Sequence, residues 1–412
     1  MKSFLLAILL SSFFYIIATA QVIDSTLDVV NWNVEWFGSN QNGPTDKTKQ
    51  EQNVIKVLRY LDADIFALSE IVDTTSLRRV VNALGTDYGF FISPYCSLAG
   101  STLDADWVSG QKLVFIYKKS VFSNIKVEGL LRNSGAAYTN FASGRYPYSF
   151  TANTRINNKV INIQFILIHG KSGVNASDYF RRRDACDELK DSLDASAATK
   201  PIIILGDYND DLDVTIANNT PTASSYNSLV RDSTDNNSYH SITLPLSYMG
   251  KKSTISYNDM IDHQVISNEL LPMYVKGSAA VRTDVTAIVP DYNNRNTSDH
   301  YPISSKFIIN NGDTTTTITP NPTSPTPSLA LNISVWPNPF SNFIIIRNNA
   351  ASNISNIRIT TLQGLQVYNS KTVIGTNSTE TITLPSYLAP GVYFLHIYTT
   401  AGIKVIKLQK LP

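Results

Sequence analysis

Short apolar runs alternate with polar stretches along most of the chain, at lengths typical of β-strands. In the first two thirds of the sequence such runs predict strands over residues 27–34, 65–68, 113–117, 160–168 and 202–205. Two longer stretches repeat apolar positions at helical spacing and predict helices over residues 45–61, capped by Thr45, and 177–193. Strands interleaved with helices favour an α/β sandwich.

The last part of the chain has a different pattern. Residues 311–328, NGDTTTTITPNPTSPTPS, contain almost no apolar residue and predict a linker. Beyond it, short strands over residues 343–347, 357–361, 380–384, 392–398 and 403–408 are separated by turns and predict a small all-β sandwich. We therefore divide the chain into a large part, residues 21–310, and a C-terminal part, residues 329–412.

The first twenty residues have the pattern of a secretory signal peptide. Lys2 supplies a positive start, residues 4–17 are apolar except for a serine pair, and Ala18-Thr19-Ala20 resembles a cleavage site. A membrane anchor is the alternative, but the run is shorter than the roughly 20 residues that a span needs. We expect a mature protein that begins at Gln21, leaves the cytoplasm and has no integral membrane span.

Composition narrows the class of protein. Charged residues make up 16% of the 412 residues, against about 25% in an average soluble domain, and the formal net charge is +1. The large part has a net charge of −4 and the C-terminal part +5. A broad basic surface for nucleic acid is therefore not expected. The two cysteines, Cys96 and Cys186, exclude a disulfide framework, and a single bridge or two free thiols remain open.

Polar residues that suit metal-assisted phosphate chemistry follow several of the apolar runs. A strand fixes the backbone, so polar side chains just past its end can converge on one cleft. Each cluster alone is weak evidence, since carboxylates at such positions are often caps or solvated loop residues; their joint occurrence carries the argument. The residues are Asn33, Glu35, Glu70, His169, Asp207, Asn209, Asp262, Asp299 and His300. Carboxylate and amide oxygens are ligands preferred by Mg²⁺ or Mn²⁺.

The order of these segments resembles the endonuclease/exonuclease/phosphatase superfamily, across about residues 27–308. The motifs are Trp32-Asn33, the segment DIFALSE over 64–70, the histidine in FILIHG, GDYN over 206–209 and SDH over 298–300. The resemblance implies a four-layer α/β sandwich and metal-dependent hydrolysis of phosphate esters. The expected cofactor is Mg²⁺ or Mn²⁺; Ca²⁺ stays open as a structural ion.

Carried over to this chain, the resemblance implies a metal site and a substrate site. Glu70 becomes the principal metal ligand, and Glu35 and Asp299 help to hold the metal. Asn33 and Arg145, the latter in GRYPYSF, contact the phosphate of the substrate.

The resemblance also assigns the catalytic residues. Asp207 and Asn209 position the attacking water and the scissile phosphate, and His300 is the catalytic histidine, paired with Asp262. His169 takes the place of the second histidine of deoxyribonuclease-like members. The glutamate that often partners this histidine is replaced by Gln111, so we expect His169 to bind phosphate or to contribute weakly.

The C-terminal part resembles the type IX secretion sorting domain of Bacteroidetes-type bacteria. The resemblance rests on VWPNPF over residues 335–340, TLQG over 361–364 and LAPGVYF over 388–394. It implies that the type IX secretion machinery recognises the protein, and that the protein reaches a secreted or cell-surface location through the periplasm. A carbohydrate-binding module is the rival interpretation, although no cluster of aromatic residues supports it.

The sequence thus predicts a secreted, monomeric phosphodiester hydrolase, most simply a nuclease acting on nucleic acid. A sphingomyelinase-like lipid phosphodiesterase and a non-catalytic surface protein that keeps the fold are the alternatives. The sequence does not separate DNA from RNA, or cutting within a strand from cutting at its end.

Overall fold

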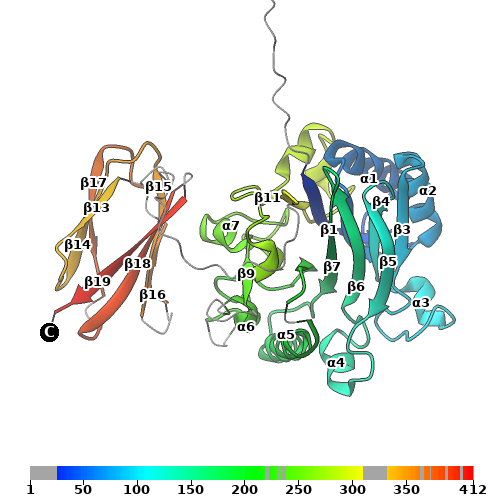
Figure 1. Cartoon of the computed structure of the whole chain (residues 1–412), viewed down its shortest axis with the longest axis horizontal. Helices are drawn as coiled ribbons and strands as arrows, with labels where there is room; N and C mark the ends of the chain where they lie inside the picture. Colours follow the sequence, from blue (N-terminus) through cyan, green and yellow to red (C-terminus); the bar gives the residue numbers. More distant parts are fainter. Residues whose placement is uncertain are drawn as a thin grey trace, which may run out of the picture.

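The computed structural model describes residues 26–309 and 332–411, apart from residues 198, 219–221, 231, 233–237, 362–365, 372, 386–387 and 400–401. The expected signal peptide and the expected linker therefore lie outside the described residues. Within them, two bodies of secondary structure are present, an α/β body and a C-terminal all-β body (Figure 1).

The first sheet of the α/β body carries the N-terminal strand at its centre. Its strands follow the order β11-β12-β1-β2-β4-β3. They are β1 (Leu27–Phe37), β2 (Ile65–Ile71), β3 (Tyr88–Ile92), β4 (Lys112–Lys118), β11 (Ala280–Val281) and β12 (Ile303–Phe307). β1 and β2 are parallel, so their carboxyl ends meet at one edge of the sheet.

The second sheet has the order β5-β6-β7-β8-β10-β9. Its strands are β5 (Phe122–Gly129), β6 (Tyr148–Ile156), β7 (Lys159–His169), β8 (Ile202–Asp207), β9 (Tyr239–Ser241) and β10 (Asp262–Ser267). β7 and β8 are parallel, and β10 runs antiparallel to β8 with Asp262 opposite Asp207. The end of β8 and the start of β10 therefore lie together.

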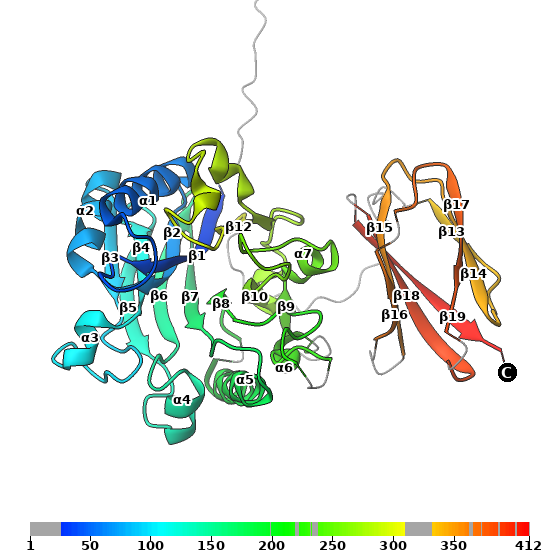
Figure 2. The same ribbon diagram turned by 180° about the vertical axis from the view of Figure 1, so that it is seen from behind.

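The two sheets pack face to face, and helices cover their outer faces (Figures 1 and 2). One apolar cluster joins Phe115 of the first sheet to Phe165 of the second. A second cluster packs the first sheet against α1 (Lys47–Leu61) and α2 (Thr74–Leu84), and a third packs the second sheet against α5 (Ala176–Ala197). These four layers confirm the expected α/β sandwich.

Short helices occupy the connections at the sheet ends. They are α3 (Ala105–Ser109), α4 (Gly135–Asn140), α6 (Asn227–Val230), α7 (Leu244–Tyr248), η1 (Asn268–Leu270), η2 (Thr283–Ala287) and η3 (Tyr292–Asn294). The amino end of α1 corrects one prediction. Its cap is Asp46, whose side chain accepts a bond from the Lys49 amide, and not Thr45.

The C-terminal body is a β-sandwich, as predicted. A three-stranded sheet, β13-β14-β17, faces a four-stranded sheet, β16-β15-β18-β19. The strands are β13 (Ile333–Trp336), β14 (Phe343–Asn348), β15 (Ile354–Thr361), β16 (Gln366–Ser370), β17 (Ser378–Thr383), β18 (Gly391–Thr399) and β19 (Gly402–Lys410). Side chains such as Ile346, Ile357 and Leu395 fill the space between the sheets.

The C-terminal body touches α7 of the α/β body. The rings of Tyr248 and Tyr398 lie 4.8 Å apart, and the Asn356 side-chain amide donates to the Tyr248 carbonyl over 3.0 Å.

Both cysteines of the chain, Cys96 and Cys186, are buried free thiols, which resolves the alternative that the sequence left open.

Candidate active site

The parallel strand pairs bring most of the predicted residues to one edge. His169 ends β7 and Asp207 ends β8, and the two are directly paired in the sheet. Glu70 lies near the end of β2, and Asn33 lies in the neighbouring strand β1. The carboxyl ends of two parallel pairs, one in each sheet, thus face each other across the sandwich.

Glu70, His169 and Asp207 form a compact group that could hold a cation. Their ligand atoms all lie within 4.8 Å of one another. The Nε2 atom of His169 is 3.6 Å from Oε1 of Glu70 and 3.5 Å from Oδ2 of Asp207. The Asn33 amide donates to Glu70 over 3.1 Å and to Asp207 over 2.9 Å. Two carboxylates and an imidazole this close fit a divalent cation, and the oxygen donors suit Mg²⁺ or Mn²⁺.

A buried histidine and carboxylate form the second half of the site. Nδ1 of His300 lies 2.7 Å from Oδ2 of Asp262, and Nε2 of His300 lies 3.9 Å from Asp207. Burial alone would disfavour a charged imidazole, but the charge of Asp262 and its hydrogen bond outweigh it and hold the pKa of His300 well above its ordinary value. The pair therefore favours a charged imidazole at His300, and Nε2 of His300 faces Asp207.

The surroundings of the two histidines shift their pKa values in opposite directions. Burial, together with the charges of Arg145 and His300, lowers the pKa of His169 well below its ordinary value. Nδ1 of His169 is buried and has no hydrogen-bond partner among the described residues. Burial and the charge of Asp262 raise the pKa of Asp207. A neutral His169 can accept a proton or bind a cation, and a charged His300 can donate a proton.

Glu35 and Asp299 lie beside this group, but an arginine that the sequence analysis missed engages both. Nη2 of Arg295 bonds Oε1 of Glu35 and lies 3.4 Å from Oδ2 of Asp299. The pKa of Glu35 is raised by burial and, to a smaller extent, by the charge of Asp299, although the hydrogen bond from Arg295 acts to lower it. Metal ligation by Glu35 and Asp299 stays a prediction, because the group within 4.8 Å does not include them.

Several site residues adopt the left-handed backbone conformation that non-glycine residues avoid. The φ angles are 42° at Glu35, 49° at Trp36, 62° at Glu70 and 52° at Asn209. Within this backbone, the Trp36 amide donates a hydrogen bond to Oε2 of Glu70 over 2.9 Å. Strain of this kind costs about 1–3 kcal/mol per residue and gathers at functional sites.

Asn209 and Arg145 hold the loops around the site. The Asn209 amide donates to Oδ1 of Asp207 over 2.8 Å, and its side chain donates to the Gly170 carbonyl over 3.2 Å. Arg145 is buried and donates to the His169 and Gly170 carbonyls over 3.1 and 2.9 Å. Its predicted contact with phosphate stays a prediction, since these bonds direct it to the backbone.

Gln111 has a partner other than the one expected from its position. Its Oε1 atom accepts a bond from Nη1 of Arg145 over 2.8 Å. Gln111 therefore supports His169 through Arg145, whose two carbonyl bonds fix the end of β7 and the residue after it.

A further arginine, Arg182 of α5, fixes two loops near the site, and the sequence analysis did not predict it. Arg182 is fully buried, and its guanidinium donates to the Lys171 and Gly173 carbonyls over 2.9 and 2.8 Å. Its Nε atom lies 3.7 Å from the buried carboxylate of Asp210. Arg182 thus joins the loop after His169 to the loop after Asp207.

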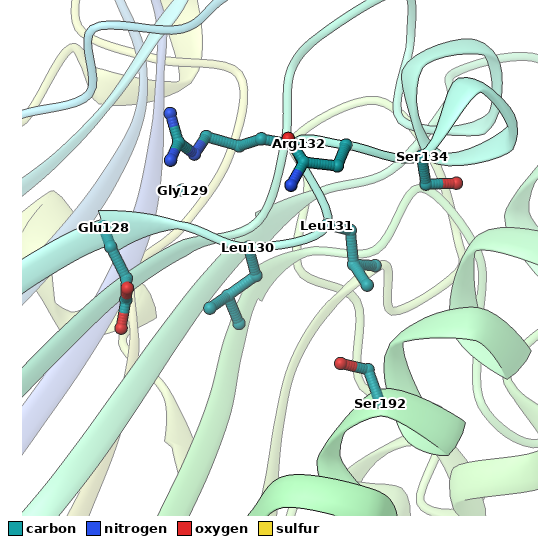
Figure 3. A pocket seen from close by; sticks show the side chains of 8 residues that line it. Glu128, Gly129, Leu130, Leu131, Arg132, Ser134 and Ser192 are labelled. Carbon is teal, nitrogen blue, oxygen red and sulfur yellow. The ribbon is translucent and has the colours of Figure 1, made fainter.

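A hollow of about 460 Å³ lies away from this chemistry (Figure 3). It is formed between the segment that follows β5 and the Ser192 side of α5, with Arg132 and Leu131 among its lining residues. None of the candidate site residues lines it. The site is therefore defined by its convergent polar groups and not by this hollow.

The sequence matches the profile of the endonuclease/exonuclease/phosphatase family over residues 30–300. This match covers more than half of the chain, so the protein belongs to that family and is a hydrolase of its fold. A comparison with curated protein sequences found no match.

Several solved structures are similar to this chain at low sequence identity. A family member from Beutenbergia cavernae is 12% identical, with a TM-score of 0.48, 93% of this chain covered and 100% of that chain. The catalytic domain of human nocturnin, with a bound sulfate, is 15% identical, with a TM-score of 0.45 and coverage of 69% and 96%. A mannosyl-6-phosphatase of Bacteroides thetaiotaomicron is 14% identical, with a TM-score of 0.43 and coverage of 69% and 100%.

The C-terminal body matches the secretion system C-terminal sorting domain over residues 334–410. This domain directs the protein to the type IX secretion machinery and to the cell surface or the extracellular space. Among the described residues, every helix is too short or too polar to cross a bilayer.

Proposed function

We propose that the protein is a secreted, divalent-metal-dependent phosphodiester hydrolase, and that its substrate is a nucleic acid. The observation that carries the proposal is the placement of Glu70, His169 and Asp207 opposite the buried His300–Asp262 pair. A cation site and a charged proton donor on facing strand ends suit attack of water on a phosphate ester.

The roles follow from the contacts. Glu70 and Asp207 would hold the cation with His169, and Asn33, which bonds both carboxylates, would keep them apart. A bound cation would neutralise the charge of the phosphate oxygens and polarise the phosphorus centre. Asp299 and the buried Glu35, both in contact with Arg295, would add negative charge beside this group.

The remaining groups handle the phosphate and the protons. The charged His300, whose Nε2 atom faces Asp207, would stabilise the negative charge that builds on the phosphate. Asp262 would keep its imidazole charged and oriented. Asn209, fixed by Asp207 and Gly170, would bind a phosphate oxygen or the attacking water, with Arg145 fixing the loop beside it.

Hydrolysis of bis(4-nitrophenyl) phosphate, plasmid DNA, single-stranded DNA and RNA tests this proposal. We expect activity with Mg²⁺ or Mn²⁺ and none in excess EDTA, and a loss of roughly 10³-fold or more in Glu70→Ala. Glu380→Ala, which alters an exposed glutamate of β17, is the matched control and should retain the activity. Full hydrolysis in EDTA, or an active Glu70→Ala, would refute the metal role. Inactivity of the unaltered protein with every substrate and ion would favour the non-catalytic alternative.

A lipid phosphodiesterase is the second candidate, because apolar side chains project from the segment around α3. Leu98, Leu103 and Val108 are 65%, 94% and 71% exposed. Exposed apolar residues on one short segment are a feature of proteins that dock on lipid. Cleavage of sphingomyelin in vesicles, lost in Leu103→Asp but with bis(4-nitrophenyl) phosphate hydrolysis retained, would favour this candidate over the nuclease.

We also propose the chain organisation on which these assignments rest. It consists of a signal peptide over residues 1–20, a catalytic domain over 21–310, a linker over 311–328 and the sorting domain over 329–412. The mature protein should be a monomer, which sedimentation equilibrium would test.

A further inference from the structure

A loop over residues 253–261 is anchored at the edge of the candidate site. Thr254 pairs with His300 as an isolated bridge, and the Ile255 amide donates to the Asp299 carbonyl over 2.8 Å. The start of the loop therefore lies against the segment that carries the catalytic histidine.

The tip of this loop presents an aromatic side chain to the solvent. Tyr257 is 66% exposed, and its amide donates to the Thr254 hydroxyl over 3.0 Å, which fixes the backbone beneath the ring. Large aromatic side chains are normally buried for the free energy gained by removing them from water. An exposed ring on a fixed loop is instead available to stack on a planar partner.

The positively charged side chain of Arg295 lies at the same edge of the site. The side chain of Arg295 is 55% exposed, and both of its carboxylate contacts, to Glu35 and Asp299, are made by Nη2. Its Nε and Nη1 atoms have no acceptor recorded among the described residues. Asp299, whose carboxylate contacts Arg295, also accepts a bond at its carbonyl from the Ile255 amide of the loop that carries Tyr257. The Tyr257 loop and the side chain of Arg295 therefore both contact Asp299, the residue next to His300.

We propose that Tyr257 and Arg295 form a nucleotide-binding rim, at which Arg295 contacts a backbone phosphate and Tyr257 stacks on an unpaired base. The inference rests on the proposed function, because the phosphate next along the strand would lie at His300. A guanidinium matches phosphate geometry, and a tyrosine ring stacks on any base. A base can reach the ring only when it is not paired within a duplex, so the ligand class is single-stranded nucleic acid.

Binding of fluorescein-labelled single-stranded DNA and RNA, followed by anisotropy in EDTA, tests the rim without hydrolysis. Tyr257→Ala should weaken binding roughly 5- to 150-fold, the range that stacking on one base supplies. It should leave the binding of an abasic strand of equal length unchanged. Arg295→Ala should weaken binding of both strands and reduce the slope of log K against log salt by about 0.7. Arg295→Lys should restore that slope.

A partly exposed tyrosine–arginine pair elsewhere on the surface gives matched controls. Arg282 lies over the Tyr60 ring at 5.7 Å, away from the predicted catalytic residues. Tyr60→Ala and Arg282→Ala should leave oligonucleotide binding unchanged. The rim is refuted if Tyr257→Ala weakens binding no more than Tyr60→Ala, or weakens the abasic strand equally. It is also refuted if Tyr257→Ala impairs only binding to phosphatidylcholine vesicles.

Failure of the rim and failure of the proposed function remain distinguishable. Bis(4-nitrophenyl) phosphate carries a single phosphate and no base, so its metal-dependent hydrolysis by the unaltered protein tests the function alone. Hydrolysis of this ester without any effect of Tyr257→Ala on strand binding would overturn only the rim. Strand binding that needs Tyr257 in a protein that hydrolyses nothing would uphold the rim and overturn the hydrolase proposal.

Discussion

The buried pair of His300 and Asp262 leads to a prediction in which activity and stability respond differently. Asp262 is fully buried, Asp207 is 2% exposed, and the charged imidazole of His300 lies 2.7 Å from the first and 3.9 Å from the second. In His300→Ala, both carboxylates lose this cation while they stay buried. Removing one partner of a buried pair costs about 3–5 kcal/mol, so the free energy of unfolding should fall by about that amount.

Asp262→Asn should behave differently. The amide has nearly the shape of the carboxylate, and the change removes a negative charge that acts on Asp207. We therefore expect the free energy of unfolding to fall by less than in His300→Ala, since only Asp207, and not Asp262, is left as a buried carboxylate beside an uncharged imidazole. The imidazole of His300, however, loses the carboxylate that keeps it charged. Hydrolysis should fall roughly 10²–10⁴-fold in Asp262→Asn, and by about 10³-fold or more in His300→Ala.

Two assays separate these effects. Urea unfolding in EDTA measures stability without a bound cation, and hydrolysis of bis(4-nitrophenyl) phosphate with Mg²⁺ or Mn²⁺ measures activity. His240→Ala, which alters a half-buried histidine outside the site, is the control for both. Equal destabilisation by His300→Ala and Asp262→Asn would refute the reasoning, because it would show that packing, and not the unpaired charge, sets the cost. An active Asp262→Asn would refute the catalytic role of the pair.

Three further predictions follow from buried charges and from the domain division. Burial lowers the pKa of His263 to about 3 in the folded protein, so as the pH falls the unfolded chain binds a proton at this histidine before the folded protein does. The free energy of unfolding should therefore fall by about 1.4 kcal/mol per pH unit below about pH 6.5. Urea unfolding should show that His263→Gln loses this dependence on pH. Arg182→Ala should lower the free energy of unfolding by about 3–5 kcal/mol because Asp210 loses its buried cation, whereas the exposed Arg183→Ala should change it by about 0.5 kcal/mol at most. Residues 21–310 expressed alone should fold and hydrolyse phosphodiesters, as circular dichroism and the ester assay would show, and an unfolded product would contradict the proposed boundary.

Strands with buried residues on both faces were predictable from the sequence. β2, β7 and β8 consist largely of apolar residues because helices cover one face of each sheet and the partner sheet covers the other. β5 was missed, since exposed residues such as Lys126 interrupt its pattern at the edge of the second sheet. The strand β6 was missed as well, although it lies next to β7.

The residues of the site also divide into those that the sequence predicts and those that it does not. Glu70, His169 and Asp207 were predictable because each follows an apolar run and the parallel pairing of the strands brings the ends together. Arg182 and Arg295 were not, because their roles depend on contacts over 28 to 260 positions of the chain, which periodicity does not record. The partner of Gln111 could not be predicted for the same reason.

The charge of the catalytic domain and the charge of its site act at different ranges. A net charge of −4 over residues 21–310 predicts weak long-range attraction of a polyanion, and at about 0.15 M salt such fields are screened beyond roughly 8 Å. Within that distance the relevant charges are local. His300 is charged through Asp262, and Arg295 stands exposed at the mouth. Since these cations lie beside a group of carboxylates that needs a divalent cation to become neutral, phosphate should bind more tightly when the ion is present. Recognition would then depend on the ion, the charged histidine and the exposed arginine, and an acidic domain could act on nucleic acid without a basic face.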